Sequence, residues 1–466
     1  MEKIRVGFVP AHREPFDEEW AIQMRKRCLE AFSEVNELEV VVPKEKLTKN
    51  GLVRNDAEAE KTIQLFTEEK INGLIIGTMT FGDEVSALSV ASAFSRLPIM
   101  LFGTKEGPFK SDGGRNSDSF CGTLSVSSGL YRRKIPFVFA GIVFPEEKGF
   151  LNNVRNFIRV CSVVKGFIGA QVGLVGPRPE RFETCIFSED AMIKQFKQRV
   201  VPISLVDILK RIHRLGHEDQ AVKEIIQEMS RQVDLSSLED EIVSKIAKLE
   251  CVLKNFAEEK SLLGMGVQCW TAIQEVYGVS PCYVMGRLTE QGIMTSCEVD
   301  IYGALTMLIQ YLASLKTTAP HFIDWTIQHQ EEENVFLAWH CGNAPTSLCC
   351  EGCEIAIRSH SILGETLGLE RSVGTAEFQL KPGVVTLCRL VEYNGKFKML
   401  ITKGNILKTD QRLRGAWSWV HVPNLNSLYR TLVEEGFIHH ASLIHGDYTQ
   451  VIMDACRFLG IETVIM

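Results

Sequence analysis

The chain has 466 residues, of which 45% are hydrophobic and 23% charged, and its formal net charge is -7. That length is too great for one hydrophobic core, so we expect two to four domains. The acidic balance argues against a nucleic-acid binder, no apolar run approaches the ~20 residues of a membrane span, and fourteen cysteines without an export signal favour free thiols in the cytoplasm.

Residues 1–166 are predicted to form a doubly wound α/β domain. Amphipathic helical stretches alternate with short runs rich in Val, Ile and Leu at 4–10, 38–43, 71–78, 97–103 and 135–141. Such runs between helices predict a parallel sheet that is covered on both faces. Functional loops of these sheets follow the carboxyl ends of the strands, which here are the segments 10–15, 78–84 and 103–115.

Residues 167–316 are predicted to form a second α/β domain of the same kind. Its strand-like runs are 170–176, 200–205, 262–270 and 292–298. The long region 207–259 mixes acidic and basic residues along helical stretches, which indicates a largely solvated pair of helices. The last helix of this domain is expected at 300–315.

Residues 317–466 are predicted to form a β-rich domain. Successive strands with turn signals between them run from 321 to 423, a spacing typical of an antiparallel barrel or sandwich. The tail from 432 to 466 returns to a β–α–β pattern. The predicted fold class is therefore α/β, with two doubly wound parallel-sheet domains followed by a barrel-like antiparallel domain.

Two carboxylates lie at the junction between the last parallel strand and the last helix. Asp300 precedes the helix and is expected to be its N-cap, a role worth about 1 kcal/mol. Glu298 stands at the end of the strand, where α/β sheets present ligands or bases. From the residues alone, a functional and a structural role for Glu298 both remain open.

Three further polar residues interrupt strand-like runs: Asp324 in HFIDWT, His340 in VFLAWH and His440 in FIHHASLIHG. Carboxylates and imidazoles at element ends are suitable metal ligands. A surface-facing Asp324 and a hydrogen-bonded core His340 remain alternatives. Neighbouring strand residues point to opposite faces, so at most one of His439 and His440 is expected in a shared site.

Other motifs carry weaker signals. Cys341, Cys349, Cys350 and Cys353 leave a zinc site open, but a clean second ligand pair is absent, so reduced loop thiols are favoured. The Gly-rich pieces GLVGPRPER and TKEGPFKSDGG match neither the P-loop nor the dinucleotide fingerprint, and only Arg178 is kept as a substrate contact. No GxSxG nucleophile elbow occurs, which argues against a serine hydrolase.

Several of these segments resemble the superfamily of L-fucose and L-arabinose ketol isomerases. CEVDIYGALTMLI resembles the family's Glu-x-Asp junction, and HFIDWT resembles the segment with its second acidic ligand. FLAWHCGNAP and FIHHASLIHG resemble the arabinose-isomerase segments that carry His ligands. The resemblance covers 260–466 by motifs and the earlier residues by architecture alone. It implies a metal site of Glu298, Asp324, His340 and His440, with Glu298 and Asp324 as the catalytic pair.

Two departures place the chain between branches of that superfamily. Asp324 matches the fucose branch, whereas arabinose isomerases carry Glu there. His340 matches the arabinose branch and has no counterpart in the fucose branch. The sugar therefore cannot be carried over from either branch, and we expect a pentose, a 6-deoxyhexose or a hexose substituted at C6, for example by a sulfonate.

The activity implied by the resemblance is that of an enzyme, an aldose–ketose isomerase. It would move a proton between C1 and C2 of an open-chain sugar through a metal-held cis-enediol. The implied cofactor is a divalent metal, Mn²⁺ foremost, with Co²⁺, Fe²⁺, Mg²⁺ or Zn²⁺ as alternatives. A non-catalytic sugar-binding or regulatory protein on the same scaffold is the runner-up, and a cysteine-based zinc protein is a third reading.

The resemblance also implies partners and substrate contacts. The family forms hexamers or related homo-oligomers in which an N-terminal domain covers a neighbour's site, so His12 and Arg13 would reach a neighbour's substrate. AWSWVHVP is similar to the aromatic substrate wall of fucose isomerases, which implies a contact from Trp417 or Trp419. Gln268 is a further substrate-binding candidate. A small-molecule sugar is the expected partner, with no nucleic acid and no membrane.

Overall fold

The computed structural model describes residues 3–216 and 218–466, and the chain divides into two compact units. The first unit comprises residues 1–165 and 453–460, and the second comprises 166–452 and 461–466. The predicted boundary near residue 316 falls inside the second unit and stays a prediction. Within the described residues, no helix combines the length and the hydropathy that crossing a bilayer requires.

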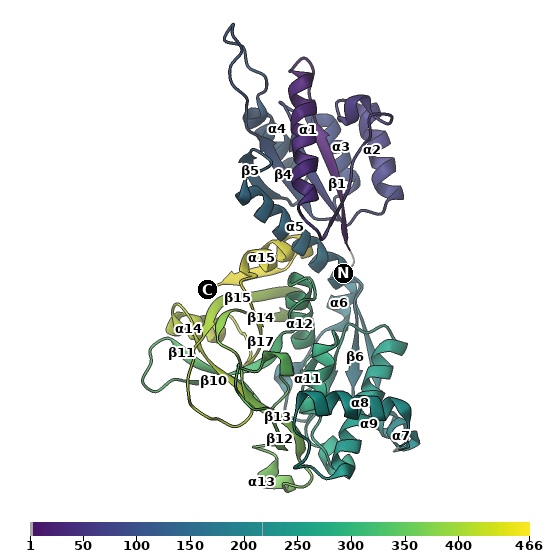
Figure 1. Ribbon diagram of the computed structural model, residues 1–466, viewed down its shortest axis with the longest axis vertical. Helices are drawn as coiled ribbons and strands as arrows, with labels where there is room; N and C mark the ends of the chain where they lie inside the picture. The colour runs from purple at the N-terminus through teal and green to yellow at the C-terminus, as the bar shows by residue number, and fades with distance from the viewer. Residues whose placement is uncertain (1–2, 217) are drawn as a thin grey trace. The chain divides into compact units, whose positions relative to one another are not determined.

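The first unit is a doubly wound domain, as predicted. Its parallel sheet has the order β2-β1-β3-β4-β5. The strands are β1 (Ile4–Ala11), β2 (Leu38–Val41), β3 (Gly73–Thr78), β4 (Ile99–Thr104) and β5 (Val138–Val143). Helices α2 (Asp56–Glu68), α3 (Glu84–Ala93) and α4 (Ser119–Arg132) share a core on one face. Helices α1 (Glu18–Ser33) and α5 (Lys148–Phe167) bring Phe32 and Phe150 into ring contact on the other (Figure 1).

The second unit begins with a smaller parallel sheet of order β7-β6-β8-β9. Its strands are β6 (Gln171–Val175), β7 (Arg199–Ile203), β8 (Gly264–Val267) and β9 (Met294–Cys297). Its helices are α6 (Glu189–Phe196), α7 (Leu205–Arg214), α8 (Gln220–Gln232), α9 (Asp240–Glu259), α10 (Ala272–Tyr277) and α11 (Cys282–Glu290). Each strand of this sheet ends on the same edge, which is where loop residues can converge.

The predicted solvated helical pair at 207–259 is wrong. The described part of that region holds three helices, α7 to α9, and α9 buries most of its length. Even Glu250 on α9 is fully buried, because Arg287 of α11 pairs with it at 2.6 Å. Charged residues in a helix therefore do not mark a solvated face when a partner on another helix neutralises them.

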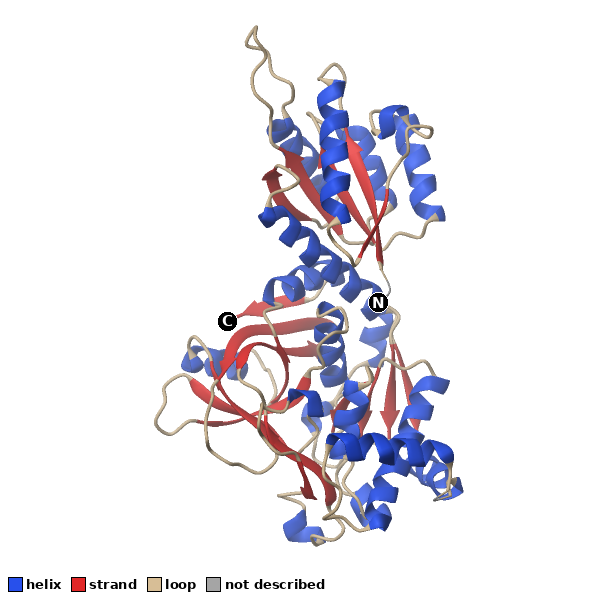
Figure 2. Ribbon diagram, in the orientation of Figure 1, coloured by secondary structure: helices blue, strands red, loops and turns tan. Residues whose placement is uncertain are grey.

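The remaining strands form a nine-stranded sheet that closes into a ring (Figure 2). Its order is β12-β13-β16-β11-β10-β17-β14-β15-β18, and β15 also pairs with β16. The bounds are β10 (His321–Gln328), β11 (Val335–His340), β12 (Ala356–Ser359), β13 (Val373–Gln379), β14 (Gly383–Tyr393), β15 (Lys396–Ile406), β16 (Ala416–His421), β17 (His440–His445) and β18 (Glu462–Ile465). Because the pairing of β15 with β16 closes the ring, the domain is a barrel and not a sandwich. Helices α13 (Gly364–Leu367) and α14 (Leu425–Glu434) complete the unit, whereas α15 (Thr449–Leu459) belongs from residue 453 onward to the first unit.

Helix α12 (Ile301–Ala313) joins the small sheet to the ring. It packs against β8 and β9 on one side and against β14 and β17 on the other. Its residues are apolar nearly all round and almost all buried, as expected for a helix between two layers. Gln310 anchors it by donating to the carbonyl oxygens of Thr386 and Ser442 at 3.0 and 3.1 Å. The amino end of α12 is thereby held at the carboxyl edge of β9.

Candidate metal centre

The turn between β9 and α12 has an unusual backbone. Glu298 and Val299 both have left-handed conformations, with φ of +58° and +61°. A β-branched residue such as Val avoids this region, and each strained residue costs about 1–3 kcal/mol. The neighbouring strand makes room for the turn, since a Cβ at Gly266 would lie 2.9 Å from Val299 Cα. The surrounding structure thus enforces a turn that presents the Glu298 side chain.

Asp300 closes that turn and has two roles. Its Oδ1 accepts the Gly303 N–H at 2.9 Å, which confirms the predicted N-cap of α12. Its carboxylate also pairs with both terminal nitrogens of Arg389 on β14, the contact from Nη2 to Oδ1 being 3.1 Å. Burial raises the pKa of Asp300, but the charge of Arg389 and the hydrogen bond from His440 outweigh it, and the pKa lies well below the usual range.

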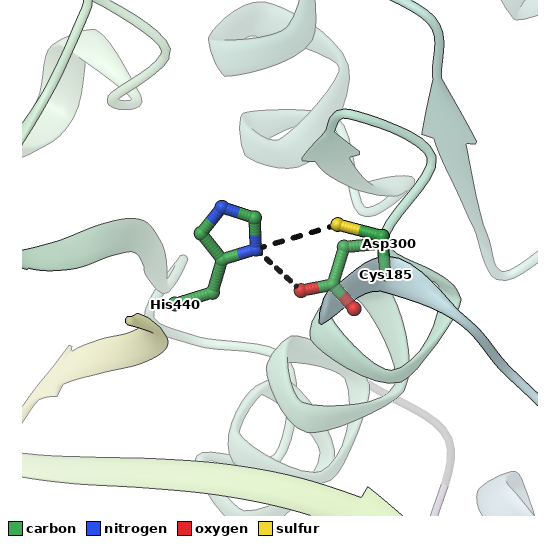
Figure 3. A group of neighbouring side chains, drawn as sticks. All are labelled: Cys185, Asp300 and His440. Carbon is green, nitrogen blue, oxygen red and sulfur yellow. Dashed lines mark hydrogen bonds and ion pairs between the residues drawn. The ribbon is translucent and has the colours of Figure 1, made fainter. Parts of the chain in front are cut away.

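His440, the first residue of β17, is oriented by this carboxylate. Its Nδ1 lies 2.8 Å from Asp300 Oδ2 and 4.0 Å from Cys185 Sγ (Figure 3). A carboxylate can only accept, so Nδ1 carries the ring hydrogen toward Asp300. Burial lowers the pKa of His440, but hydrogen bonds to Asp300, Cys185 and Glu298 outweigh it and raise the pKa well above its usual value. The surroundings therefore favour a positive charge at this position.

The other ring nitrogen of His440 faces two further carboxylates. Its Nε2 lies 2.9 Å from Glu298 Oε2 and 3.7 Å from Asp324 Oδ1. Asp324 arrives there because it is the strand partner of His440 in the β10–β17 pairing. Burial, with the nearby charges of Glu298 and Asp300, raises the pKa of Asp324 to about 7 against the opposing effect of His440.

His340, the last residue of β11, completes the group. Its Nδ1 lies 2.9 Å from the Cys341 N–H and 3.8 Å from Cys297 Sγ. Burial lowers the pKa of His340 well below its usual value, so the ring is neutral. A neutral imidazole has one ring hydrogen. If Nε2 bound a cation, that hydrogen would move to Nδ1 and point toward the Cys297 sulfur, and the hydrogen bond that Nδ1 accepts from the Cys341 N–H would be lost.

The four predicted ligands share one feature. Each directs one buried ligand atom at the cluster: Glu298 Oε2, Asp324 Oδ1, His340 Nε2 and His440 Nε2. Among the described residues, Asp324 Oδ1 and His340 Nε2 have no hydrogen-bond partner, whereas Glu298 Oε2 and His440 Nε2 lie 2.9 Å apart and form an ion pair when the ring is protonated. One ligand atom each from Glu298, His340 and His440 lie within 4.8 Å of one another. Buried polar atoms are normally satisfied, so such a cluster needs an explanation. Two oxygens and two imidazole nitrogens suit a divalent first-row metal, so the residues fit the predicted group, and their roles stay predictions.

Several neighbours of this cluster were not predicted. Trp270 donates its Nε1 hydrogen to Glu298 Oε1 at 3.1 Å. A nitrogen of His439 also lies near Asp324 and His440, but that side chain is exposed and does not join the group of Glu298, His340 and His440. The expectation that at most one histidine of the pair enters the site therefore stays a prediction. Arg389 could have been suspected from the sequence, because it is a single cation inside the apolar run GVVTLCRLVEY and a buried cation needs an acidic partner.

The substrate-binding candidates of the second unit lie in different surroundings. Gln268 follows β8 on the same sheet edge as Glu298, and its Oε1 is buried without a partner among the described residues. Arg178 is exposed in the loop after β6. Trp417 and Trp419 are buried in a cluster with Leu337 and other residues of β11. Their contacts with a substrate stay predictions.

His12 and Arg13 belong to the first unit, at the carboxyl end of β1. His12 is fully buried, with Nδ1 2.8 Å from Thr80 Oγ1 and with Nε2 unpartnered among the described residues. Burial lowers its pKa. Arg13 is exposed, and its guanidinium lies 4.9 Å from the centre of the Phe81 ring. Their predicted contact with a neighbouring subunit's substrate stays a prediction.

The cysteine expectations need a correction. Cys350 and Cys353 form a disulfide, so they are not the free thiols expected from composition. The sequence did not predict the disulfide, because two cysteines separated by two residues occur in metal sites, redox pairs and plain loops alike. Across the described ranges, the groups that gather three metal-ligating side chains include none of Cys341, Cys349, Cys350 or Cys353. The zinc reading therefore finds no geometric support there.

Comparisons with known proteins point to one family. Two family models match the chain, one described as fucose/sulfoquinovose isomerase, N-terminal domain, over residues 7–168, and one as L-fucose isomerase, C-terminal domain, over residues 338–466. The chain is 27% identical over 472 residues to the sulfoquinovose isomerases of Priestia aryabhattai and Priestia megaterium, with all of each chain covered. It is 25% identical over 397 residues to that of Alkalicoccus urumqiensis, covering 84% of this chain and 86% of the relative.

The chain belongs to the fucose isomerase-like superfamily of sugar isomerases. The resemblance read from its motifs is confirmed by both domain models, and the relatives cover its full length.

Proposed function

We propose that the protein is a divalent-metal-dependent aldose–ketose isomerase that interconverts a C6-sulfonated aldohexose and its ketose. The observation that supports the metal site is the gathering of two carboxylates and two imidazoles, with one buried ligand atom from each of Glu298, Asp324, His340 and His440. The sulfonated substrate is supported by the relatives that are named sulfoquinovose isomerases. We propose Mn²⁺ as the working metal, because two carboxylates and two imidazoles are suitable ligands for it. The same ligands also suit other first-row divalent metals, so the availability of each metal in the cell decides which one binds.

A divalent cation in this cluster would hold the open-chain sugar by two oxygens and polarise its carbonyl group. The chain itself supplies the proton transfer. Glu298 and Asp324 are the carboxylates that face the common point, and one removes the proton from C2 while the same or the other returns it to C1. Trp270 holds Glu298 through Oε1 and leaves Oε2 directed at the cluster.

Metal analysis and hydrogen exchange test the proposal together. Purified protein is dialysed against Mn²⁺, its metal content is measured, and it is then incubated with sulfoquinovose in deuterated water. We expect stoichiometric metal, ketose formation and deuterium at C2. The Glu298→Gln plus Asp324→Asn variant should lose metal and at least about 10³-fold in rate.

Glu392→Gln is the matched control, since Glu392 is a hydrogen-bonded carboxylate that accepts from Tyr302 and Gly395 outside the cluster. Wild-type protein without bound divalent metal, or a double variant that keeps its activity, contradicts the proposal. Sugar binding without any exchange or ketose formation supports the non-catalytic alternative instead.

The proposal includes a homo-oligomer whose active sites are shared between subunits. It is supported by the unpartnered Nε2 of His12 and by the exposed guanidinium of Arg13, which offer groups to a ligand at that edge of the first unit. Light scattering gives the subunit number. Mixing inactive Glu298→Gln and Arg13→Met proteins should restore part of the activity if one subunit completes another's site, and no restoration would speak against sharing.

A further inference from the structure

A cavity of about 630 Å³ lies on the ring sheet, where its lining residue Trp417 is the strand partner of Trp339, which in turn pairs with Asp324. Strands β12, β13 and β16 and the loop before β16 form its walls, and Trp417 is one of its lining residues. Three arginines also line it, Arg358, Arg412 and Arg414. None of them takes part in the metal cluster or in the proton transfer proposed above.

Backbone contacts hold Arg414 and Gly415 against β11, the strand that carries His340. Trp339 donates its Nε1 hydrogen to the Arg414 carbonyl at 2.7 Å, and Trp339 is the strand partner of Asp324. A Cβ on Gly415 would lie only 2.7 Å from the carbonyl oxygen of His340. The end of the loop is thus pressed against the strand that carries His340.

A second path links the same arginine to Glu298. Arg414 donates from Nη2 to the carbonyl of Ser359 at 2.7 Å. The next residue, His360, packs edge-on against Trp270 with 6.2 Å between ring centres, and Trp270 donates to Glu298. Two separate chains of contacts therefore link Arg414 to predicted ligands, one through Trp339 and one through His360 and Trp270.

The guanidinium of Arg414 is held in one orientation. Its Nε lies 2.8 and 2.7 Å from the two oxygens of Glu377, which is 6% exposed. With Nε and Nη2 engaged, Nη1 keeps no hydrogen-bond partner within residues 3–216 and 218–466, and half of the side chain is exposed. Arg358 Nε lies 3.9 Å from Glu377, so two guanidinium groups face one carboxylate and an excess positive charge remains.

Exposed carboxylates also line this cavity, namely Glu354 and Asp410. The carboxylates offset the charge of the arginines, so the cavity as a whole does not attract an anion. An anion would be received where a fixed N–H donor is free, which is the Nη1 edge of Arg414. A guanidinium with an anion forms charge-assisted hydrogen bonds that are about twice as strong as neutral ones.

We propose that Arg414 determines the substrate specificity of the enzyme by binding the sulfonate at the far end of the open-chain sugar. This inference rests on the function proposed above and names the group that recognises the charged end. The metal cluster would hold the reacting carbons, and Trp417 would lie along the chain between the two ends. Glu377 positions Arg414 and does not itself touch the substrate.

The test compares two sugars on one set of variants. kcat/KM is measured for sulfoquinovose and for 6-deoxyglucose, which lacks the sulfonate but keeps the reacting carbons. Arg414→Met should lower kcat/KM for sulfoquinovose by about 100-fold, mainly through KM, and leave the 6-deoxyglucose value within about 3-fold. Arg414→Lys keeps the charge without the fork and should lose about 10-fold on sulfoquinovose alone.

Arg430→Met is the matched control, because Arg430 is an exposed arginine on α14 that does not line the cavity. Metal content and thermal unfolding are recorded for every variant. An equal loss on both sugars in Arg414→Met and Arg414→Lys, or no loss on either, overturns the inference. If the wild type isomerises neither sugar, the proposed function itself fails, so the two failures are distinguishable.

Discussion

The two sides of His440 have opposite surroundings. On the Nδ1 side, Asp300 is held by Arg389, by the Gly303 N–H and by His440 itself, and its pKa stays low. On the Nε2 side, Glu298 and Asp324 face the ring itself, and no arginine or lysine of the described chain pairs with either carboxylate. We call these the paired side and the open side of His440.

The difference shows how the chain separates orientation from binding. A buried ion pair adds little net stability, because desolvation offsets most of the attraction. The pair of Asp300 and Arg389 is better understood as a fixed acceptor that sets the tautomer of His440 and leaves Nε2 free. The open side collects negative charge that only an external cation or a proton can balance, and the raised pKa of Asp324 follows from this.

Breaking the paired side should have the largest effect. Arg389→Met leaves the Asp300 carboxylate buried without its guanidinium, so we expect the free energy of unfolding to fall by about 3–5 kcal/mol. Urea unfolding of metal-free protein measures this. Lys403→Met removes a half-exposed partner of Asp447 and should change stability by at most about 1 kcal/mol. An equally small change for Arg389→Met would show that Asp300 does not depend on its partner.

A milder change on the same side should affect the open side. Asp300→Asn keeps an oxygen that can accept from His440 Nδ1 but removes the charge. We expect the affinity for Mn²⁺ to fall by about 10- to 100-fold, the usual range for such outer partners. Calorimetric titration measures it, with Asp447→Asn as the surface control. An unchanged affinity would mean that the geometry of the turn alone positions His440.

A buried histidine without an acidic partner, His321, offers a comparison with His440, because its pKa is lowered where that of His440 is raised. His321 is fully buried, its Nε2 lies 3.2 Å from Asn343 Oδ1, and burial lowers its pKa from 6.5 to about 3. The unfolded chain therefore takes up a proton near pH 6.5 that the folded chain refuses. The buried neutral ring therefore costs no stability above pH 6.5. As the pH falls from 6.5 toward 3, protonation of the unfolded chain lowers the free energy of unfolding, and this loss is about 2 kcal/mol at pH 5.

His321→Gln should remove this share of the acid sensitivity. The measurement is the difference in unfolding free energy between pH 7.5 and pH 5 for wild type and variant. His421→Gln, at an exposed position, should leave that difference unchanged. A variant that loses as much stability in acid as the wild type would show that His321 is not the group that titrates.

The open side was readable from the sequence, and the paired side was not. Glu298, His340 and His440 lie at element ends and Asp324 interrupts a strand, so each stood out locally, and the family resemblance implied their role as ligands. Arg389 meets Asp300 only because β14 and β17 pair in a particular register around α12. Two elements 89 residues apart must be placed before that contact exists, and no local pattern contains it.

The elements themselves were predicted unevenly for similar reasons. Strands such as β10 and β14 lie within the strand-rich segment predicted from 321 to 423, because apolar runs between turn signals mark them in the sequence. Helix α14 was missed although its N-cap was present, with Asn424 accepting the Ser427 N–H. Barrel and sandwich could not be distinguished, since the extra pairing of β15 with β16 depends on strand curvature rather than on residue type.

The smallest expected effect concerns the one chain donor on the open side. Trp270→Phe removes the hydrogen bond to Glu298 Oε1 and leaves the ring packing. One such bond contributes about 1 kcal/mol, so the affinity for Mn²⁺ should fall by about 3- to 10-fold, less than for Asp300→Asn. Trp325→Phe is the control, because the buried Nε1 of Trp325 has no partner in the described chain. Trp270→Phe could instead lower the affinity for Mn²⁺ as much as Asp300→Asn does. That result would mean that Glu298 depends on its hydrogen-bond donor as strongly as His440 depends on its acceptor, and that both sides of His440 need a positioning partner.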